Sequence, residues 1–387
     1  MKKVIGIGLA IILVGITFSF YGQKTSNSGP NESFVKPPQD RRYDQVCWLK
    51  THNAYSAERY GYVYANQYYT IEEQLDRGVR GFELDTYKRC WKKTAGVFGS
   101  DGCTVSMCHG VCDVSNKWIY KPWKPGNDAL GFASSGLAPI KKFLEKYPDE
   151  IITIYLENYV LFDRGAKEDM LDDAIEKSGV VPFLLRPEDW DPSQQGWPTI
   201  GWMIKNNKRL IIFNDKSANK QTTKPEVLSR PYASTKYTYY QWKTIVQNQW
   251  GGAKDINKAL QERGNSVQNS GTKRFLLELD WYPDGGKILG GPISDVINKF
   301  GGVFSDEKQI PFGGNFAKLN GPDLQAFLKR AREKGLQPSG IGEKRYPNVI
   351  SVDFFHEGEP TPLSMVNEIN ARANDAQLRE QMFAPMQ

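Results

Sequence analysis

The sequence predicts an α/β protein built on a parallel sheet whose two faces are both covered. Short apolar runs, each as long as a buried strand, alternate along the chain with stretches of helical periodicity. The composition is that of a globular protein, with 40% hydrophobic and 24% charged residues, which excludes disordered, collagen-like and coiled-coil chains. The pattern leaves open whether the sheet closes into a barrel or stays open and doubly wound.

The expected elements follow one another along the chain. Seven apolar runs predict strands at residues 45–52, 79–87, 104–109, 151–159, 209–214, 274–281 and 348–355. An eighth strand is expected within residues 231–246. Apolar residues at helical spacing predict helices at residues 70–77, 137–147 and 322–334. Because no repeat or linker is visible after Asp40, residues 41–387 are expected to form a single domain.

The first 22 residues have the layout of a targeting segment. Lys2 and Lys3 precede an apolar stretch over residues 4–21, and the polar residues 23–40 are expected to be a linker. This pattern predicts a secretory signal peptide. A retained N-terminal anchor is the alternative, because the stretch approaches the ~20 apolar residues that span a bilayer. We therefore expect an exported protein that is secreted, periplasmic or held to a membrane by this segment.

The cysteines agree with export. Cys47 stands alone, whereas the other four cysteines lie close together, at Cys90, Cys103, Cys108 and Cys112. In an oxidising compartment such a cluster predicts one or two disulfides, whose connectivity the sequence does not reveal. A zinc site is the alternative, although the spacing lacks the paired C-x2-C knuckles that such sites use.

The charge balance bears on possible partners. Lys and Arg number 50 against 44 Asp and Glu, a net charge of +6. This excess is too mild for a nucleic-acid binder but is compatible with an anionic surface. The chain is expected to be a monomer. It contains three histidines, His52, His109 and His356, so any imidazole chemistry must come from these.

Polar side chains end several consecutive predicted strands. In a parallel α/β barrel these strand ends meet at one face, where such enzymes keep their active sites. Taken singly, each side chain has a structural explanation. A histidine can be hydrogen-bonded within the fold, for example, and an asparagine can form a turn. Together, two histidines, three carboxylates and one amide at neighbouring strand ends predict a functional site. Its members are His52, Asn53, Glu83, Asp85, His109 and Glu157.

These side chains divide into two chemical groups. The amide and the three carboxylates are hard oxygen ligands, which suit Ca²⁺ or Mg²⁺ rather than zinc. Without a cation, the crowded carboxylates would repel one another. The two histidines are then free for proton transfer and for stabilising charge on a phosphoryl group. The combination predicts phosphodiester cleavage with the metal as Lewis acid.

Four motifs in order carry a resemblance to a known family. They are WLKTHNAY at 48–55, GVRGFELD at 78–85, CHG at 108–110 and IITIYLEN at 151–158. In sequence and spacing they resemble the X-box half of phosphatidylinositol-specific phospholipase C, clearly from about residue 45 to residue 158. Residues 348–355 resemble the family's last strand. The resemblance implies a TIM-type (β/α)8 barrel, often imperfectly closed.

The resemblance also implies roles for individual residues. His52 is similar to the histidine that contacts the scissile phosphate, and His109 to the general acid for the diacylglycerol oxygen. Attack by the inositol 2-hydroxyl, with Glu83 or Glu157 as the base, would give a cyclic inositol phosphate. The residues that match the ligands of the calcium-dependent branch, with Mg²⁺ less expected, are Asn53, Glu83, Asp85 and Glu157. In the metal-independent branch, Asp follows the first histidine and Arg replaces Asp85.

Other positions bear on the substrate. Eukaryotic members of the family carry lysines just after the strand equivalent to residues 210–213 to hold ring phosphates, whereas here Asn214 and Asp215 stand in that place and only Lys216 is basic. Phosphorylated phosphoinositides are therefore not expected as preferred substrates. Asp280 and Tyr282 end a later strand and are expected to bind the inositol ring. The alternative is that they have structural roles alone, as a capping carboxylate and a packed aromatic ring.

A candidate membrane-contact loop follows the His109 strand. Residues 117–125 interleave aromatic and lysine side chains, which is typical of loops at a lipid interface. The aromatic members are Trp118, Tyr120 and Trp123. A loop packed on the barrel rim is the alternative. His356 has no counterpart in the family pattern and is expected at the surface.

Two other function classes compete with the phospholipase. One is a related barrel phosphodiesterase for another head group, such as a glycerophosphodiesterase or a sphingomyelinase D-like enzyme, which usually opens with a different histidine motif and binds Mg²⁺. The other is a non-catalytic barrel that binds a lipid or a glycan. The intact pair of His52 and His109 beside a complete ligand set argues against a binder.

Overall fold

The computed structural model of the protein describes residues 33–60, 65–91, 102–108, 131–162, 166–247, 276–281, 324–325 and 346–383. They belong to one compact unit, Glu32–Gln387. The targeting segment expected at residues 1–22 and most of the helix expected at 322–334 lie outside the described residues. None of the helices in the described part of the chain is long and apolar enough to cross a membrane.

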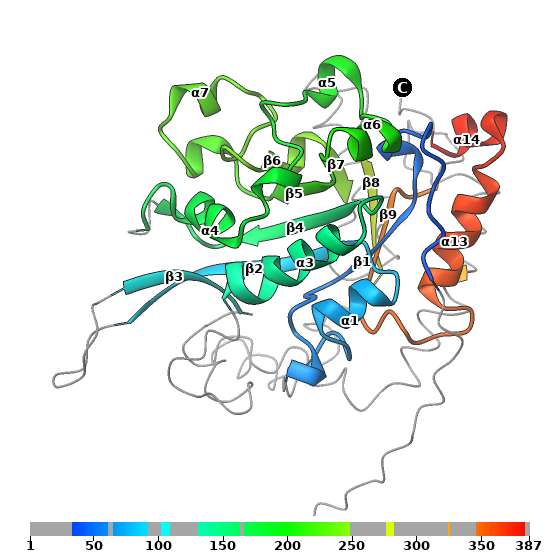
Figure 1. Cartoon of the computed structure of the whole chain (residues 1–387), viewed down its shortest axis with the longest axis horizontal. Coiled ribbons are helices and arrows are strands. Elements are labelled where there is room, and N and C mark those ends of the chain that lie inside the picture. Colours follow the sequence, from blue (N-terminus) through cyan, green and yellow to red (C-terminus); the bar gives the residue numbers. More distant parts are fainter. Residues whose placement is uncertain are drawn as a thin grey trace, which may run out of the picture. The chain divides into compact units, whose positions relative to one another are not determined.

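The described strands form one sheet, shown in Figure 1. Its order is β6-β5-β4-β2-β1-β9-β8-β7, and all neighbours along this path pair in parallel. The strands are β1 (Trp48–Thr51), β2 (Gly81–Trp91), β3 (Gly102–Met107), β4 (Ile152–Asn158), β5 (Leu210–Asn214), β6 (Tyr239–Tyr240), β7 (Ile245–Gln247), β8 (Leu276–Trp281) and β9 (Val349–Val352).

The sheet curls back on itself, because its two edge strands, β6 and β7, follow one another in the chain, while the first and last strands pair in the middle of the strand order. Trp48 to Thr51 of β1 lie beside Val349 to Val352 of β9 in unbroken parallel register. Along the described chain the ring has one break, since no pairing joins β6 to β7. Only the turn at residues 241–244 separates these two strands, so the backbone itself crosses the break. The expected α/β barrel, imperfectly closed, is confirmed, and the region expected to hold the eighth strand contains both β6 and β7.

The prediction of a third parallel strand at residues 104–109 was wrong. This segment forms β3, which pairs only with β2 and runs antiparallel to it, from Thr86↔Met107 to Trp91↔Gly102. Residues 92–101 are the whole connection, which is shorter than the dozen or more residues that a parallel crossover needs. Figure 1 shows the resulting hairpin projecting beyond the neighbouring strands.

A disulfide joins the two strands of this hairpin. Cys90 and Cys103 are directly paired in the β2–β3 register and are bonded to each other. Cys108 is also disulfide-bonded, whereas Cys47 is a buried free thiol. The expected disulfides therefore exist, and a zinc site made of all four clustered cysteines is excluded because the sulfurs of Cys90, Cys103 and Cys108 are oxidised.

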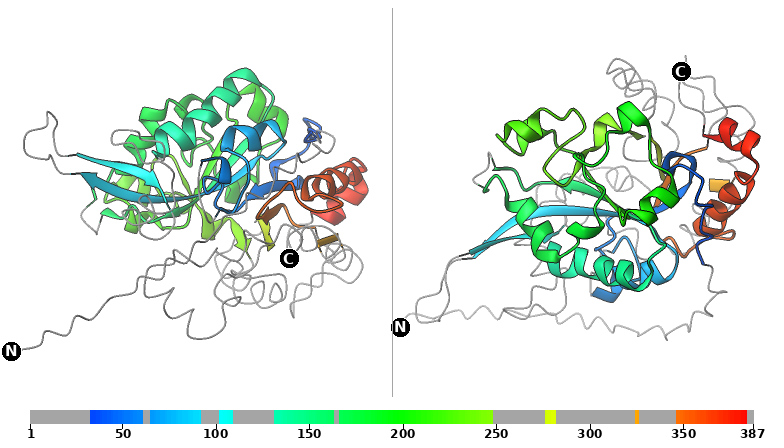
Figure 2. Two further views of the ribbon diagram at one scale, coloured as in Figure 1. Left: turned by 90° about the horizontal axis from the view of Figure 1, so that it is seen from below. Right: turned by 45° about the horizontal axis from the view of Figure 1, so that its top comes forward.

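Helices cover the outside of the sheet, as the two views of Figure 2 show. α13 packs against β1 and β9, while α1 packs against α3. The helices are α1 (Ile71–Asp76), α3 (Ala138–Lys146), α4 (Met170–Ser178), α5 (Pro192–Gln195), α6 (Ile200–Lys205), α7 (Pro225–Leu228), α13 (Pro362–Arg372) and α14 (Ala376–Met382). A π-helical turn, Phe132–Leu137, leads into α3.

Local sequence signals set the start and end of α1, which leads into β2. Thr70 accepts a hydrogen bond from the Glu73 amide (3.3 Å), and Glu73 in return accepts one from the Thr70 amide (3.0 Å), so both donors at the helix start are satisfied. Gly78 follows with φ +92°, and a Cβ there would lie 2.8 Å from Leu363. This turn therefore needs glycine to direct the chain into β2.

The residues just before the barrel pack against it. Phe34 is buried, the Val35 amide donates to Asn367 Oδ1 (2.9 Å) and Lys36 pairs with Asp149 (2.6 Å). The described end of the stretch expected to be a linker, residues 33–40, is thus attached to α13 and to the loop before β4.

Candidate active site

Polar side chains line the inside of the barrel in two levels. Residues two apart on a strand point to the same face, so β1, β2, β4, β8 and β9 each contribute an earlier side chain, assigned to the lower level, and a later one, assigned to the upper level. The lower level contains Lys50, Glu83, Tyr155, Glu278 and Ser351, and these side chains are buried. The upper level, nearer the carboxyl ends of the strands, contains His52, Asp85, Glu157, Asp280 and Asp353.

His52 follows β1 and is oriented by a carboxylate that follows β9. Its Nδ1 lies 2.8 Å from Asp353 Oδ1, and the Asn66 amide donates to the same oxygen at 3.2 Å. The Asn53 amide nitrogen lies 3.1 Å from His52 Nε2. With Nδ1–H donating to Asp353, Nε2 is the proton acceptor of the ring. The His52 side chain as a whole retains 15% of its exposure.

The turn after β1 gives Asn53 its position. Asn53 has φ 45°, a left-handed conformation that asparagine adopts more readily than most residues, and its side chain is buried. The next residue, Ala54, donates its amide hydrogen to the Glu83 carbonyl (2.9 Å), which ties the turn to β2. Gln67 donates to the carbonyls of His52 (2.9 Å) and Val352 (3.0 Å) and so holds the ends of β1 and β9 together.

The three predicted carboxylates lie on two neighbouring strands. Asp85 and Glu157 are direct partners in the β2–β4 register, and Glu83 Oε1 is 3.7 Å from His52 Nε2. Burial, together with the charges of Asp85 and Glu83, raises the pKa of Glu157 to about 8. Tyr159 donates its hydroxyl to Glu157 Oε2 (3.1 Å), which fixes this carboxylate in the wall of the site.

Below the predicted site lies a buried cation that the sequence reasoning missed. Lys50 Nζ forms ion pairs with Glu83 Oε2 and Glu278 Oε1, and it lies 4.7 Å from the centre of the Tyr155 ring. Burial by itself would lower the pKa of Lys50, but the charges of Glu278, Glu83 and Asp280 outweigh it and raise the pKa above its ordinary value. Part of the negative charge expected to need a divalent ion is thus balanced by a lysine.

The sequence contains a pattern from which Lys50, Glu278 and Asp353 could have been identified as site residues. Lys50 and Glu278 are charged residues inside otherwise apolar strands, each two positions before a polar strand end, and Asp353 is itself a strand end. The two-residue period of a strand places Lys50 on the same face as His52. A search for charges within apolar runs would therefore have found Lys50.

The donor chemistry of the site fits a hard divalent cation. Asn53, Glu83, Asp85 and Glu157 offer only oxygen ligands of the kind that Ca²⁺ prefers, from neighbouring strands. The carboxylate repulsion that raises the pKa of Glu157 is what such a cation relieves. Among the described residues, no group of three or more His, Cys, Asp and Glu side chains is already gathered closely enough to hold a metal ion.

The remaining predicted residues fall into two groups. His109, Tyr282, Trp118, Tyr120 and Trp123 lie outside the described residues. Asp280 is described and fully buried on β8, where its register partner is Ser351 of β9.

Two further sequence expectations concern the rim of the barrel. Lys216, the single basic residue after β5, forms an ion pair with Asp215 and lies 5.3 Å from the Tyr159 ring centre. His356, expected at the surface, is instead partly buried, packs against Tyr69 and pairs with Glu357 at 3.2 Å.

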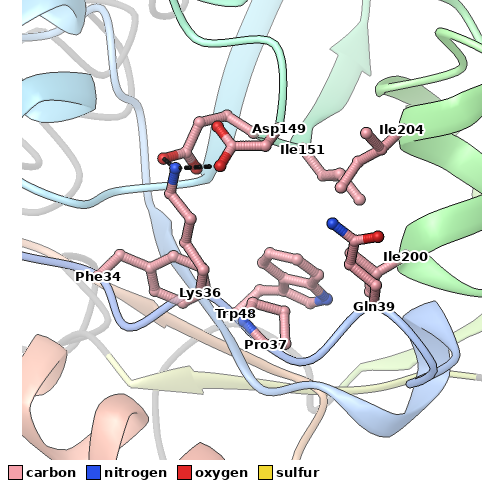
Figure 3. A pocket seen from close by; sticks show the side chains of 10 residues that line it. Phe34, Lys36, Pro37, Gln39, Trp48, Asp149, Ile151, Ile200 and Ile204 are labelled. Carbon is pink, nitrogen blue, oxygen red and sulfur yellow. Dashed lines mark hydrogen bonds and ion pairs between the residues drawn. The ribbon is translucent and has the colours of Figure 1, made fainter.

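A small pocket lies at the opposite end of the barrel (Figure 3). It is lined by Trp48 at the start of β1, by Ile151 before β4 and by Ile200 of α6. Figure 3 shows the Lys36 ammonium at its edge, paired with Asp149. Its volume of about 50 Å³ is well below the roughly 300 Å³ at which ligand pockets begin. It is therefore not a substrate site.

The chain is similar in sequence to a known family and to proteins of a plant and a fungus. A family model described as PI-PLC X 1 matches residues 39–250, more than half of the chain. A PI-PLC X domain-containing protein of Arabidopsis thaliana is 26% identical over 273 residues, covering 66% of this chain and 54% of its own. A protein of Arthroderma benhamiae named as an uncharacterized secreted protein is 24% identical over 204 residues, covering 53% of this chain and 38% of its own. The chain spans about half the length, or less, of the curated relatives it matches.

Two solved structures resemble this chain at low sequence identity. The phosphatidylinositol-specific phospholipase C of Staphylococcus aureus has a TM-score of 0.46 and 12% identity, covering 86% of this chain and 95% of its own. A calcium-dependent phosphoinositol-specific phospholipase C of a Pseudomonas species has a TM-score of 0.36 and 15% identity, covering 65% of this chain and 81% of its own.

Proposed function

Since the chain belongs to the PI-PLC X family, we propose that it is an exported, calcium-dependent phosphatidylinositol-specific phospholipase C. It cleaves phosphatidylinositol to diacylglycerol and a cyclic inositol phosphate. The observation that carries this proposal is the pairing of His52 with Asp353 next to the carboxylates of β2 and β4. That arrangement combines a proton-accepting imidazole with hard ligands for a cation.

His52 is the proposed base for the inositol 2-hydroxyl. Asp353 accepts from Nδ1, so Nε2 is left to take the hydroxyl proton while the oxygen attacks phosphorus. Asp353 also stabilises the imidazolium that results. Glu83 is a weaker candidate for this role, because Lys50 engages its Oε2 and an ion-paired carboxylate is a poor proton acceptor.

His109 is the proposed general acid. It follows β3, the strand paired with β2, and its role comes from its match to the family motif CHG. It donates a proton to the diacylglycerol oxygen as the bond from that oxygen to phosphorus breaks. His52 gains a proton and His109 loses one, so the total charge of the two histidines is the same before and after the step.

Asn53, Glu83, Asp85 and Glu157 are the proposed calcium ligands. When bound, the cation supplies Lewis-acid stabilisation of charge on the phosphoryl group. Asn53 follows β1, and Asp85 in the first half of β2 is the register partner of Glu157 near the carboxyl end of β4. Because Tyr159 already orients Glu157, this ligand is partly pre-positioned.

The proposed substrate has an unphosphorylated inositol ring. Lys216 is engaged by Asp215, and Asp215 Oδ1 also accepts from the Asn158 amide at 2.8 Å, so its carboxylate is fixed at the rim. A ring phosphate placed there would meet this negative charge. Asp280 and Tyr282 remain proposed ring contacts, and Trp118, Tyr120 and Trp123 remain proposed contacts to the membrane.

Export is supported by three independent features. The N-terminal residues 1–22 have the layout of a signal peptide or anchor. The disulfide Cys90–Cys103 is of the kind that persists in oxidising compartments. One fungal relative is named as a secreted protein.

The test is an assay of the purified chain from Glu32 onward, which keeps the residues that pack against the barrel ahead of β1, on phosphatidylinositol vesicles. Cyclic inositol phosphate and diacylglycerol are measured with calcium and then with excess chelator. We expect release with calcium, and loss of release with chelator and in His52→Ala and His109→Ala. Release that survives chelation would refute the calcium requirement and keep the phospholipase. A folded, inactive wild type would refute the phospholipase, and glycerophosphodiesters and sphingomyelin would be tried next.

A further inference from the structure

We infer that Lys50 is a positioning residue of the reaction centre, which holds one oxygen of Glu83 in the barrel floor and thereby turns the other toward His52. This inference deepens the proposed function and rests on it for its effect on catalysis. The geometric part, that Lys50 positions Glu83, stands on contacts within the chain alone.

The contacts of Lys50 leave its ammonium group little freedom. Its side chain is 1% exposed, and its two carboxylate partners, Glu83 and Glu278, are 5% and 0% exposed. The partners come from β2 and β8, and the Tyr155 ring of β4 lies 4.7 Å away. A single ammonium is thus surrounded from three other strands of the barrel. Because β1 fixes its backbone in register with both β2 and β9, the lysine cannot shift without breaking ladder pairs.

The two oxygens of Glu83 have different neighbours. Oε2 forms the ion pair with Lys50, while Oε1 lies 3.7 Å from His52 Nε2. The side chain therefore spans from the buried floor to the nitrogen proposed to take the substrate proton. Holding Oε2 restricts rotation of the whole carboxylate, since the two oxygens share one plane. The direction of Oε1 is thus set by the position of Lys50.

A role of Lys50 in stability alone does not explain why it contacts both Glu83 and Glu278. A lysine that served only to neutralise Glu278 would need no contact with Glu83. A buried ion pair is moreover weak evidence for stability, because apolar residues of similar volume often serve equally well. What an apolar replacement cannot supply is a fixed direction for the Glu83 carboxylate.

The test separates neutralisation from positioning. Lys50→Met alone leaves two buried carboxylates without their cation and is expected to be unstable. The decisive variant is therefore Lys50→Met/Glu278→Met, which removes the cation together with the carboxylate in the floor and keeps similar volumes. The double variant leaves the net charge unchanged, and Lys142→Met, an exposed lysine of α3, is the control for the charge lost in Lys50→Met. Thermal unfolding, kcat and KM on phosphatidylinositol vesicles and a crystal structure are measured for each.

Because Glu83 stays buried without its cation, we expect the double variant to melt below the wild type but above Lys50→Met. Its kcat is expected to fall by about 100-fold with little change in KM, because a displacement of about 1 Å at a reacting group has that effect. Its crystal structure is expected to show the Glu83 carboxylate turned away from His52. Lys142→Met should match the wild type.

Two results would overturn the inference: wild-type kcat in the double variant, or a Glu83 carboxylate that has not moved. A wild type that does not cleave phosphatidylinositol, together with a displaced Glu83, would refute the proposed function while leaving the positioning role supported by the crystal structure. The two failures are therefore distinguishable.

Discussion

His52 Nδ1 lies 2.8 Å from Asp353 Oδ1, although 301 positions separate the two residues in the chain. The contact exists because β9 pairs with β1, so that the residues following the first and last strands become neighbours. When Nδ1–H donates to Asp353, Nε2 is the proton acceptor of the ring. The chemistry of the site thus depends directly on how the sheet closes.

Asp353→Asn is predicted to lower kcat/KM on phosphatidylinositol by at least about 100-fold. An amide can no longer stabilise an imidazolium and can favour the wrong tautomer of His52, an effect that reaches about 10⁴-fold where a buried aspartate orients a catalytic histidine. Initial rates on vesicles measure the loss. Asp173→Asn, an exposed aspartate of α4, is the matched control and should keep full activity. Equal rates in the two variants would remove Asp353 from the mechanism.

Asp85→Asn is predicted to abolish stabilisation of the protein by calcium. A ligand that binds only the folded state at 100 times its Kd adds about 2.7 kcal/mol to the free energy of unfolding. The wild type should therefore melt at a higher temperature in millimolar calcium than in chelator, whereas Asp85→Asn should melt at the same temperature in both. If the wild-type midpoint does not respond to calcium, the four residues are not its ligands.

The stability of the calcium-free protein is predicted to fall as the pH rises from about 4.5 to about 8. The pKa of Glu157 is about 8 in the folded protein and 4.5 ordinarily, so in this window the unfolded chain has lost a proton that the folded chain keeps. The folded state is then increasingly disfavoured as the pH rises. Urea unfolding in chelator at several pH values measures the trend.

Glu157→Gln should remove most of this dependence and be more stable than the wild type at pH 8. Asp172 supplies the control, because burial raises its pKa to about 6 from 3.8, far from the site. Asp172→Asn should flatten the curve only between those two values. A wild-type stability that is constant from pH 5 to pH 8 would contradict the raised pKa of Glu157.

Asp215→Asn is predicted to reduce the preference of the protein for phosphatidylinositol over phosphatidylinositol 4-phosphate. The substitution keeps Oδ1 as an acceptor for the Asn158 amide but removes the charge that engages Lys216. The lysine is then available to a ring phosphate, so kcat/KM for phosphatidylinositol 4-phosphate should rise relative to that for phosphatidylinositol. Asp215→Asn combined with Lys216→Met should cancel the rise. An unchanged ratio in the single variant would mean that the ring does not reach this rim.

The hairpin of β2 and β3 illustrates where the prediction of the fold failed. The apolar run at residues 104–109 was correctly expected to be a strand, because its residues favour extended backbone. Its direction was not readable from that property, since strands of either direction have the same local pattern. The short connection and the register partners Cys90 and Cys103 decided it.

The candidate site, like the hairpin, was predictable from the sequence only in its local features. By itself, the sequence determined which segments are strands, that Glu83 and Asp85 share one face of a strand, and that Glu157 stands near the end of another, because hydrophobic periodicity and strand alternation are local properties of the chain. Only the tertiary structure decided that Asp353 orients His52 and that Lys50 joins Glu83 to Glu278. These partners lie on strands that become neighbours, or face one another across the barrel interior, only when the sheet curls and β9 meets β1.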